Sequence, residues 1–126
     1  MNYYELIFKR KSFHLFRGTD GKISEAELQQ LEDFIKTVKP LDTEIKTKIR
    51  IVKESETTCK RGAEYCIEFY SEVKANYLRN IGYIGEQIDL YLADKNIGAL
   101  WFGIGKPDQS EVEGLKHVIM IAIAKM

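Results

Sequence analysis

The stretch NIGYIGEQIDLYLADKNIGALWFGIGKP, residues 80–107, decides the fold because it joins two elements of different periodicity. Apolar side chains around its first part recur at helical spacing and predict a long helix over 76–96 that crosses the core. These side chains are Tyr77, Ile81, Ile84, Ile88, Tyr91 and Leu92. The segment ALWFGIG then lacks alternation, which predicts a strand over 98–104 that is buried on both faces.

Three further strands surround this segment in the sequence. Residues 45–52 and 63–70 each alternate between apolar and mostly polar side chains, the period of a strand with one wet face. The wholly apolar VIMIAIA predicts a buried strand over 117–124. Two alternating strands in near succession favour antiparallel pairing. The sequence therefore predicts an α+β fold with a mostly antiparallel sheet flanked by helices, and not a parallel doubly wound sheet.

Two more helices are predicted closer to the N-terminus. The apolar side chains within residues 3–8 share one helical face, and this short helix is expected to end near Lys11. Ser24, with Glu27 three residues later, forms a capping box that opens a second helix, and Pro40 ends it.

Composition and charge limit the kinds of partner. A chain of 126 residues with 44% apolar residues suits a single domain spanning 1–126. Nineteen basic residues balance nineteen acidic ones, so the overall charge gives no reason to expect nucleic acid or an acidic membrane. Cys59 and Cys66 are too few for a disulfide scaffold and are interpreted as reduced thiols in a cytoplasmic protein. No run resembles a signal peptide or a membrane span.

Several known site motifs are excluded by their details. In GIGKPD, residues 103–108, an aspartate stands where a dinucleotide loop needs its third glycine, and no P-loop is present. His14 and His117 have no acid or cysteine at ligand spacing, so no metal is assigned. GYIG, residues 82–85, resembles an RNA-clamping loop, but it lies within a helical pattern, where close helix packing explains the glycines better.

Two remaining segments have both a structural and a functional interpretation. In RKSFHLF, residues 10–16, two cations and a hydroxyl lie beside aromatic side chains. A helix end attracts such cations through its dipole, but a phosphate attached to a flat ring system would need the same groups. The aromatic strand at 100–102 is either plain core or, with Gly98 and Gly103 beside it, a backbone that a flat ligand can approach closely.

Together and in this order, these segments resemble the nitroreductase family of FMN-dependent oxidoreductases. The family opens with a helix followed by Arg-Arg-Ser-x-Arg-x-Phe, which corresponds to residues 10–16. Its long core helix runs into a Gly-Leu-Gly-Thr-x-Trp-x-Gly type strand, which corresponds to residues 80–107. The similarity covers essentially the whole chain and is greatest to the smaller subgroup named "putative nitroreductases".

The resemblance implies a phosphate site in the first motif. Arg10 and Ser12 match residues that hold the phosphate and ribityl chain of FMN, and Lys11 is in the neighbouring basic position. His14 replaces the usual arginine and is mostly neutral near pH 7, since an unperturbed histidine has a pKa near ~6.5. Weaker phosphate binding is therefore expected.

The second motif implies the position of the flavin ring. Trp101, Phe102 and Gly103 match the strand that passes the isoalloxazine edge, where a backbone N–H faces the flavin N5. In this family NAD(P)H reduces the flavin, and a nitroaromatic or quinone then accepts the electrons. No side-chain acid or base is required, so no catalytic side chain is expected.

The resemblance also implies a homodimer, because the flavin of the family lies in a subunit interface. Family members normally continue past the final strand, so this domain is expected to lack their C-terminal part and to bind FMN weakly or not at all. The alternative is a catalytically degenerate relative that acts as a weak flavin-binding or oligomerisation module. A nucleic-acid module using Arg10, Lys11, Lys60 and Arg61 is disfavoured by the zero net charge.

Overall fold

The computed structural model describes residues 22–103 and 105–126 and contains one antiparallel sheet with two helices. The elements are α2 (Glu25–Ile35), β1 (Thr47–Lys53), the 3₁₀ turn η1 (Glu54–Glu56), β2 (Tyr65–Ser71), α3 (Tyr77–Asp94), β3 (Ile97–Phe102), β4 (Glu111–Val112) and β5 (Leu115–Lys125). The strand order is β1-β2-β5-β3, with β4 paired to β5. All pairings are antiparallel, which confirms the predicted fold class. The predicted helix ending near Lys11 lies outside the described residues.

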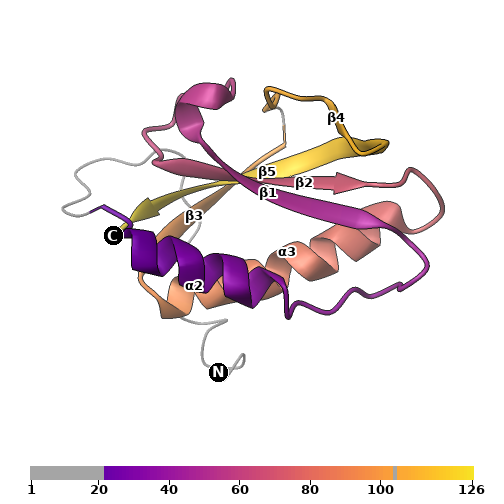
Figure 1. Cartoon of the computed structure of the whole chain (residues 1–126), viewed down its shortest axis with the longest axis horizontal. Coiled ribbons are helices and arrows are strands. Elements are labelled where there is room, and N and C mark those ends of the chain that lie inside the picture. Colours follow the sequence, from indigo (N-terminus) through magenta and orange to yellow (C-terminus); the bar gives the residue numbers. More distant parts are fainter. Residues whose placement is uncertain (1–21, 104) are drawn as a thin grey trace.

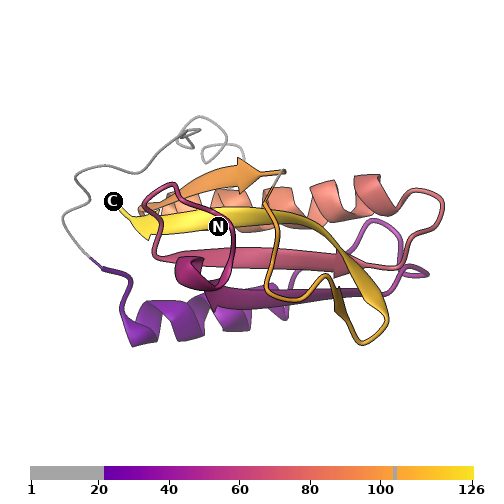
Figure 2. The same cartoon turned by 90° about the horizontal axis from the view of Figure 1, so that it is seen from above.

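Both helices lie on the same side of the sheet (Figure 1). Seen from above, α2 runs along the β1 side and α3 along the β3 side (Figure 2). Every second residue of the strands faces the helices and joins their apolar side chains in one cluster. Its fully buried members include Leu31, Ile67, Phe69, Ile88, Leu92, Ile121 and Ile123. The helix-covered face is therefore the main core.

The capping box predicted at Ser24 is present. The Ser24 hydroxyl accepts from the Glu27 N–H at 3.1 Å, and the Glu27 carboxylate accepts from the Ser24 N–H at 3.1 Å. Glu64 fastens this helix start to the sheet, because one of its carboxylate oxygens accepts from the Ile23 N–H at 2.9 Å and the other from the Lys125 N–H at 2.8 Å. Residues far apart in the sequence thus meet where α2 begins.

The opposite face of the sheet differs from the prediction. Cys66, Glu68 and Tyr70 were expected on the wet face of β2, but all three side chains are fully buried. The residues between β1 and β2 cover this face, as does the connection from β3 to β5. The two connections are joined to each other, since the Thr58 and Lys106 backbones share one hydrogen bond and the Thr58 hydroxyl accepts from the Lys106 N–H at 2.8 Å. Coverage by loops has no periodic signal in the sequence, so the alternation of β2 indicated a solvated face.

The short hairpin between β4 and β5 was not predicted either. Its two central residues, Glu113 and Gly114, both have positive φ, at 53° and 80°. Such a turn favours Asn-Gly or Asp-Gly, and glutamate at the first position gives a weaker signal. The turn lets β5 begin at Leu115, two residues before the predicted strand.

Candidate functional site

β3 carries the second predicted motif and forms an edge of the sheet. The N–H of Met126 donates to the Asn96 carbonyl at 3.0 Å, at the start of the antiparallel ladder between β3 and β5. In such a ladder, every second residue points its N–H and C=O toward the partner strand, and this bond identifies which residues of β3 do so. It follows that Ala99 and Trp101 direct their backbone groups away from β5. No strand among the described residues pairs with that edge. The β3 edge therefore offers backbone donors and acceptors to a ligand.

Trp101 is anchored toward α3. Its indole N–H donates to the Asp89 carboxylate at 3.0 Å, and its ring lies parallel to Phe69 with 6.4 Å between centroids. The six-membered ring of the indole occupies the space that a Cβ on Gly85 would need. This contact confirms close packing as the role of Gly85, whereas Gly82 has open space at the same point. The side chain of Trp101 thus serves to dock β3 on α3.

Phe102 points to the other face of the sheet. The Arg61 guanidinium lies 5.2 Å from the centre of its ring, and Gly105 approaches the ring so closely that a Cβ there would collide with it. Gly103, by contrast, has open space where a Cβ would be, apart from its own chain neighbours. The end of β3 is therefore packed at Phe102 and open at Gly103.

The predicted site residues are only partly brought together. Trp101 and Phe102 direct their side chains to opposite faces, so one flat ligand can meet both only along the backbone of residues 101–103. Arg10, Lys11, Ser12 and His14 lie outside the described residues. The predicted phosphate site is therefore not placed relative to β3.

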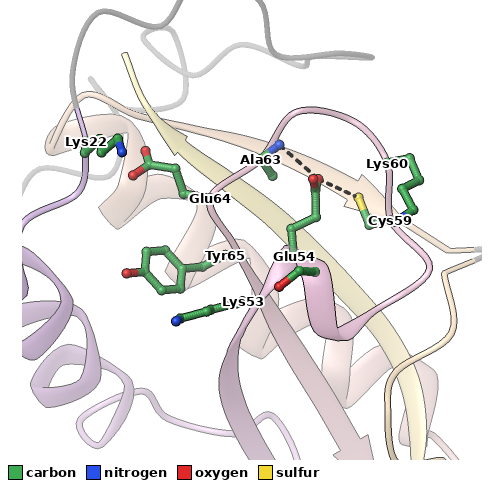
Figure 3. A pocket seen from close by; sticks show the side chains of 9 residues that line it. Lys22, Lys53, Glu54, Cys59, Lys60, Ala63, Glu64 and Tyr65 are labelled. Carbon is green, nitrogen blue, oxygen red and sulfur yellow. Dashed lines mark hydrogen bonds between the residues drawn. The ribbon is translucent and has the colours of Figure 1, made fainter.

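An open hollow that no sequence pattern predicted lies between the start of α2 and the β1–β2 connection (Figure 3). Its volume is about 430 Å³, and it is lined by Lys22, Lys53, Glu54, Ser55, Cys59, Lys60, Ala63, Glu64 and Tyr65. The three lysines form no ion pair with another residue of the described ranges. Because these residues come from separate segments, only the folded chain brings them together.

Glu54 organises the wall of this hollow. Its Oε2 accepts from the Ala63 N–H at 2.9 Å and from the Cys59 thiol at 3.3 Å (Figure 3). The same oxygen accepts from the Arg61 N–H at 3.2 Å. One carboxylate oxygen thus holds three residues of the connection between β1 and β2 together. The glutamate satisfies backbone donors that the tight turn leaves without sheet partners.

The two cysteines are free and buried. Burial raises the pKa of the Cys66 thiol to about 12, and it raises the pKa of Cys59 as well, with the hydrogen bond to Glu54 adding to the effect. A thiolate is the reactive form of cysteine. Both side chains therefore act as small apolar groups under the β1–β2 connection and not as nucleophiles.

The described residues contain neither a cluster of metal ligands nor a helix suited to a membrane. Across residues 22–103 and 105–126, no three His, Cys, Asp or Glu side chains gather closely enough to hold a metal ion. In the same part of the chain, neither helix combines the length and apolar character of a membrane span.

The model of one protein family matches almost the whole sequence. The family is described as "Putative TM nitroreductase", and the match covers residues 2–125. None of the curated proteins matches this chain in sequence.

Solved structures with the same fold are distant in sequence. A nitroreductase family protein from Clostridium difficile has a TM-score of 0.75 and 14% identity, covering 99% of this chain and 84% of that one. A "putative nitroreductase in complex with fmn" from Desulfovibrio desulfuricans has a TM-score of 0.67 and 13% identity, covering 98% and 85%. A "putative nitroreductase" from Thermotoga maritima has a TM-score of 0.60 and 22% identity, covering 99% of this chain and 48% of that one.

Proposed function

The chain belongs to this nitroreductase family, and on that premise we propose that it is an FMN-dependent oxidoreductase that uses NAD(P)H to reduce nitroaromatic or quinone-type acceptors. The observation that carries the proposal is that the family match coincides with a β3 edge, at the second motif, that no strand of residues 22–103 and 105–126 pairs with. Bound FMN supplies the redox chemistry by accepting and releasing electrons. The residues of the chain hold the flavin ring and its phosphate.

The end of β3 fits a flat ring system. Gly103 leaves open space where another residue would carry a Cβ. The side chains of Trp101 and Phe102 are held on opposite faces of the sheet by Asp89 and Arg61, so neither occupies the outer side of the edge. The outward backbone N–H of Trp101 is available as a donor to a ring nitrogen or oxygen.

Arg10, Lys11 and Ser12 are proposed to hold the phosphate. Two cations and a hydroxyl provide charge-assisted hydrogen bonds to a dianion. The carboxylate-bearing hollow beside α2 is a weaker alternative, because Glu54 and Glu64 offset much of the charge of its lysines. Arg10 and Lys60 therefore represent competing positions for the phosphate.

A matched pair of variants tests this assignment. Arg10→Ala is expected to weaken FMN binding by ~1.5–3 kcal/mol, the cost of losing a hydrogen bond to a charged group. Lys60→Ala should leave the affinity unchanged. Titration of the apoprotein with FMN, followed by quenching of flavin fluorescence, measures both. Equal affinities of the two variants would contradict the assignment to the first motif.

Activity is tested separately from binding. The purified chain, supplied with FMN, should oxidise NADH or NADPH in the presence of a nitroaromatic or a quinone, and consumption of the nicotinamide at 340 nm reports it. Bound flavin without turnover would instead support the degenerate module, which the replacement of an arginine by His14 favours. A cytoplasmic location, with its reduced thiols, is part of the proposal.

A homodimer is proposed as the functional assembly. α3 exposes Leu78 and Tyr83, whose relative exposures are 61% and 48%, and Val73 shortly before the helix is 60% exposed. Large apolar side chains that are exposed on the surface are available for a protein contact. Sedimentation of the wild type and of Leu78→Lys tests this, and a monomeric wild type at micromolar concentration would contradict it.

A further inference from the structure

A buried glutamate on β2 has no part in the proposed flavin site. Glu68 lies on the loop-covered face of the sheet, and its side chain is fully buried. One of its oxygens, Oε1, lies 3.0 Å from the Tyr70 hydroxyl and 3.6 Å from Nη1 of Arg50. The other, Oε2, has no hydrogen-bond partner among the described residues. An ionised carboxylate in such a position would lack most of the hydrogen bonds that it needs.

The hydrogen-bond geometry around Tyr70 depends on the protonation of this glutamate. The Tyr70 hydroxyl lies 2.7 Å from the carbonyl oxygen of Gln109, in addition to its 3.0 Å contact with Glu68. A carbonyl oxygen only accepts, and a tyrosine has one hydroxyl hydrogen. If Glu68 were ionised, this one hydrogen would lie between two acceptors, the Glu68 carboxylate and the Gln109 carbonyl, and could bond fully to only one of them. With a protonated Glu68, the carboxyl donates to Tyr70 and Tyr70 donates to Gln109, so both contacts are satisfied.

The charges around Glu68 agree with a neutral carboxyl. Arg50 faces it from β1 but also lies 3.6 Å from Asp108 in the connection after β3, so the guanidinium has another carboxylate partner. Burial raises the pKa of Glu68, and the charges of Asp108 and Glu56 raise it further, whereas Tyr70 and Arg50 lower it. His117 on β5 packs edge-on against the Tyr70 ring, and burial lowers its pKa.

We propose that Glu68 is protonated in the folded chain and that Glu68 and Tyr70 are positioning residues, which hold the connection after β3 in a proton-dependent way. This connection leads from the open end of β3 to β4. When Glu68 loses its proton to solvent, its carboxylate competes with the Gln109 carbonyl for the Tyr70 hydrogen, and the hold on the connection weakens. The proposal does not depend on flavin binding.

Two other contacts show where the effect can be measured. The Lys106 N–H donates to the Thr58 hydroxyl at 2.8 Å, and the His117 N–H donates to the Ser110 carbonyl at 3.0 Å. The Lys106 amide lies near one end of the connection that contains Gln109, and the His117 amide of β5 bonds the other end at Ser110. Their hydrogen-exchange rates therefore report how firmly the segment is held.

The first test measures the proton directly. In protein labelled with ¹³C, the side-chain carboxyl carbon of Glu68 should titrate above the ordinary glutamate pKa of 4.5. The carboxyl carbon of the exposed Glu32 is the internal control, which shows that glutamate carboxyl signals can be followed in the same sample. Titration of Glu68 at or below 4.5 would overturn the proposal.

The second test follows the consequence for the connection. Tyr70→Phe removes the hydroxyl and should speed exchange at Lys106 and His117 by about fivefold, the factor expected for one lost neutral hydrogen bond. In the wild type, protection at these amides should fall as the pH rises through the pKa of Glu68, after correction for intrinsic exchange. Glu68→Gln, whose amide can donate to Tyr70 at every pH, should keep the protection and lose the pH dependence. Identical pH profiles for the wild type and Glu68→Gln would overturn the proposal.

Discussion

The two faces of β2 are equally buried, but different structures bury them. Ile67 and Phe69 meet the apolar sides of α2 and α3, whereas on the other face Cys66 packs in a smaller cluster with Cys59 of the β1–β2 connection and Tyr70 donates to the Gln109 carbonyl. A helix satisfies its own backbone groups, so it needs only apolar side chains opposite it. A loop brings carbonyl and N–H groups that require partners, and on this face Tyr70, Glu54 and the Thr58 hydroxyl provide them. A buried face covered by loops therefore has a mixed polar sequence and looks solvated when read alone.

The largest expected difference between the faces is in the cost of removing an aromatic ring. Phe69→Ala empties a fully buried position in the helix-covered core and should lower the free energy of unfolding by ~3–5 kcal/mol. Phe102→Ala, on the loop-covered face, removes a half-exposed ring and should cost less than half as much. Urea denaturation followed by circular dichroism measures both. Equal losses would show that the loops pack as tightly as the helices do.

Two glycines of α3 provide a second, smaller contrast. Gly85→Ala places a methyl group against the Trp101 indole and should destabilise the chain by ~1–3 kcal/mol through overpacking. Gly82→Ala meets open space and should stabilise it by ~0.5–1 kcal/mol, because alanine is the better helix former. Thermal unfolding of both variants is the measurement. A destabilised Gly82→Ala would indicate that the exposed side of α3 is covered in solution.

A smaller effect on stability is expected from the capping interaction at the start of α2. Ser24→Ala removes the hydroxyl that accepts from the Glu27 N–H and should cost ~1 kcal/mol. Ser55→Ala, at an exposed position in η1, is the control and should leave stability unchanged. A loss of several kcal/mol for Ser24→Ala would mean that α2 docking depends on this cap far more than a helix start normally does.

The pH dependence of stability should come from the loop-covered face. The pKa of Glu68 is raised, so the unfolded chain ionises it first and stability should fall as the pH rises above 4.5. The pKa of His117 is lowered, so the unfolded chain binds the proton first and stability should fall as the pH drops below 6.5. Chemical denaturation between pH 4.5 and 8 should show the first slope reduced in Glu68→Gln and the second in His117→Gln. Unchanged slopes in both variants would assign the pH dependence to other residues.

The sequence by itself determined the elements that repeat regularly. The helical period of residues 77–92, the capping box at Ser24 and the apolar run of β5 predicted α3, the start of α2 and β5 correctly, because local periodicity records which side of an element is buried. The second helix was expected to continue to Pro40, whereas α2 ends at Ile35. The same patterns predicted the antiparallel α+β class. The motif at 98–104 was located correctly, although its strand ends at Phe102.

Only the tertiary structure decided what covers the other face of the sheet and which way the site residues point. β3 is an edge strand, so Trp101 and Phe102 serve two different packing contacts and leave the backbone for a ligand. The burial of Glu68 and the hollow beside Glu54 arise from loops that meet across long sequence separations, such as Thr58 with Lys106. The sequences of loops have no regular period that would reveal which residues are buried. The backbone N–H and C=O groups of a buried loop need hydrogen-bond partners, and these groups become buried only once the chain has folded.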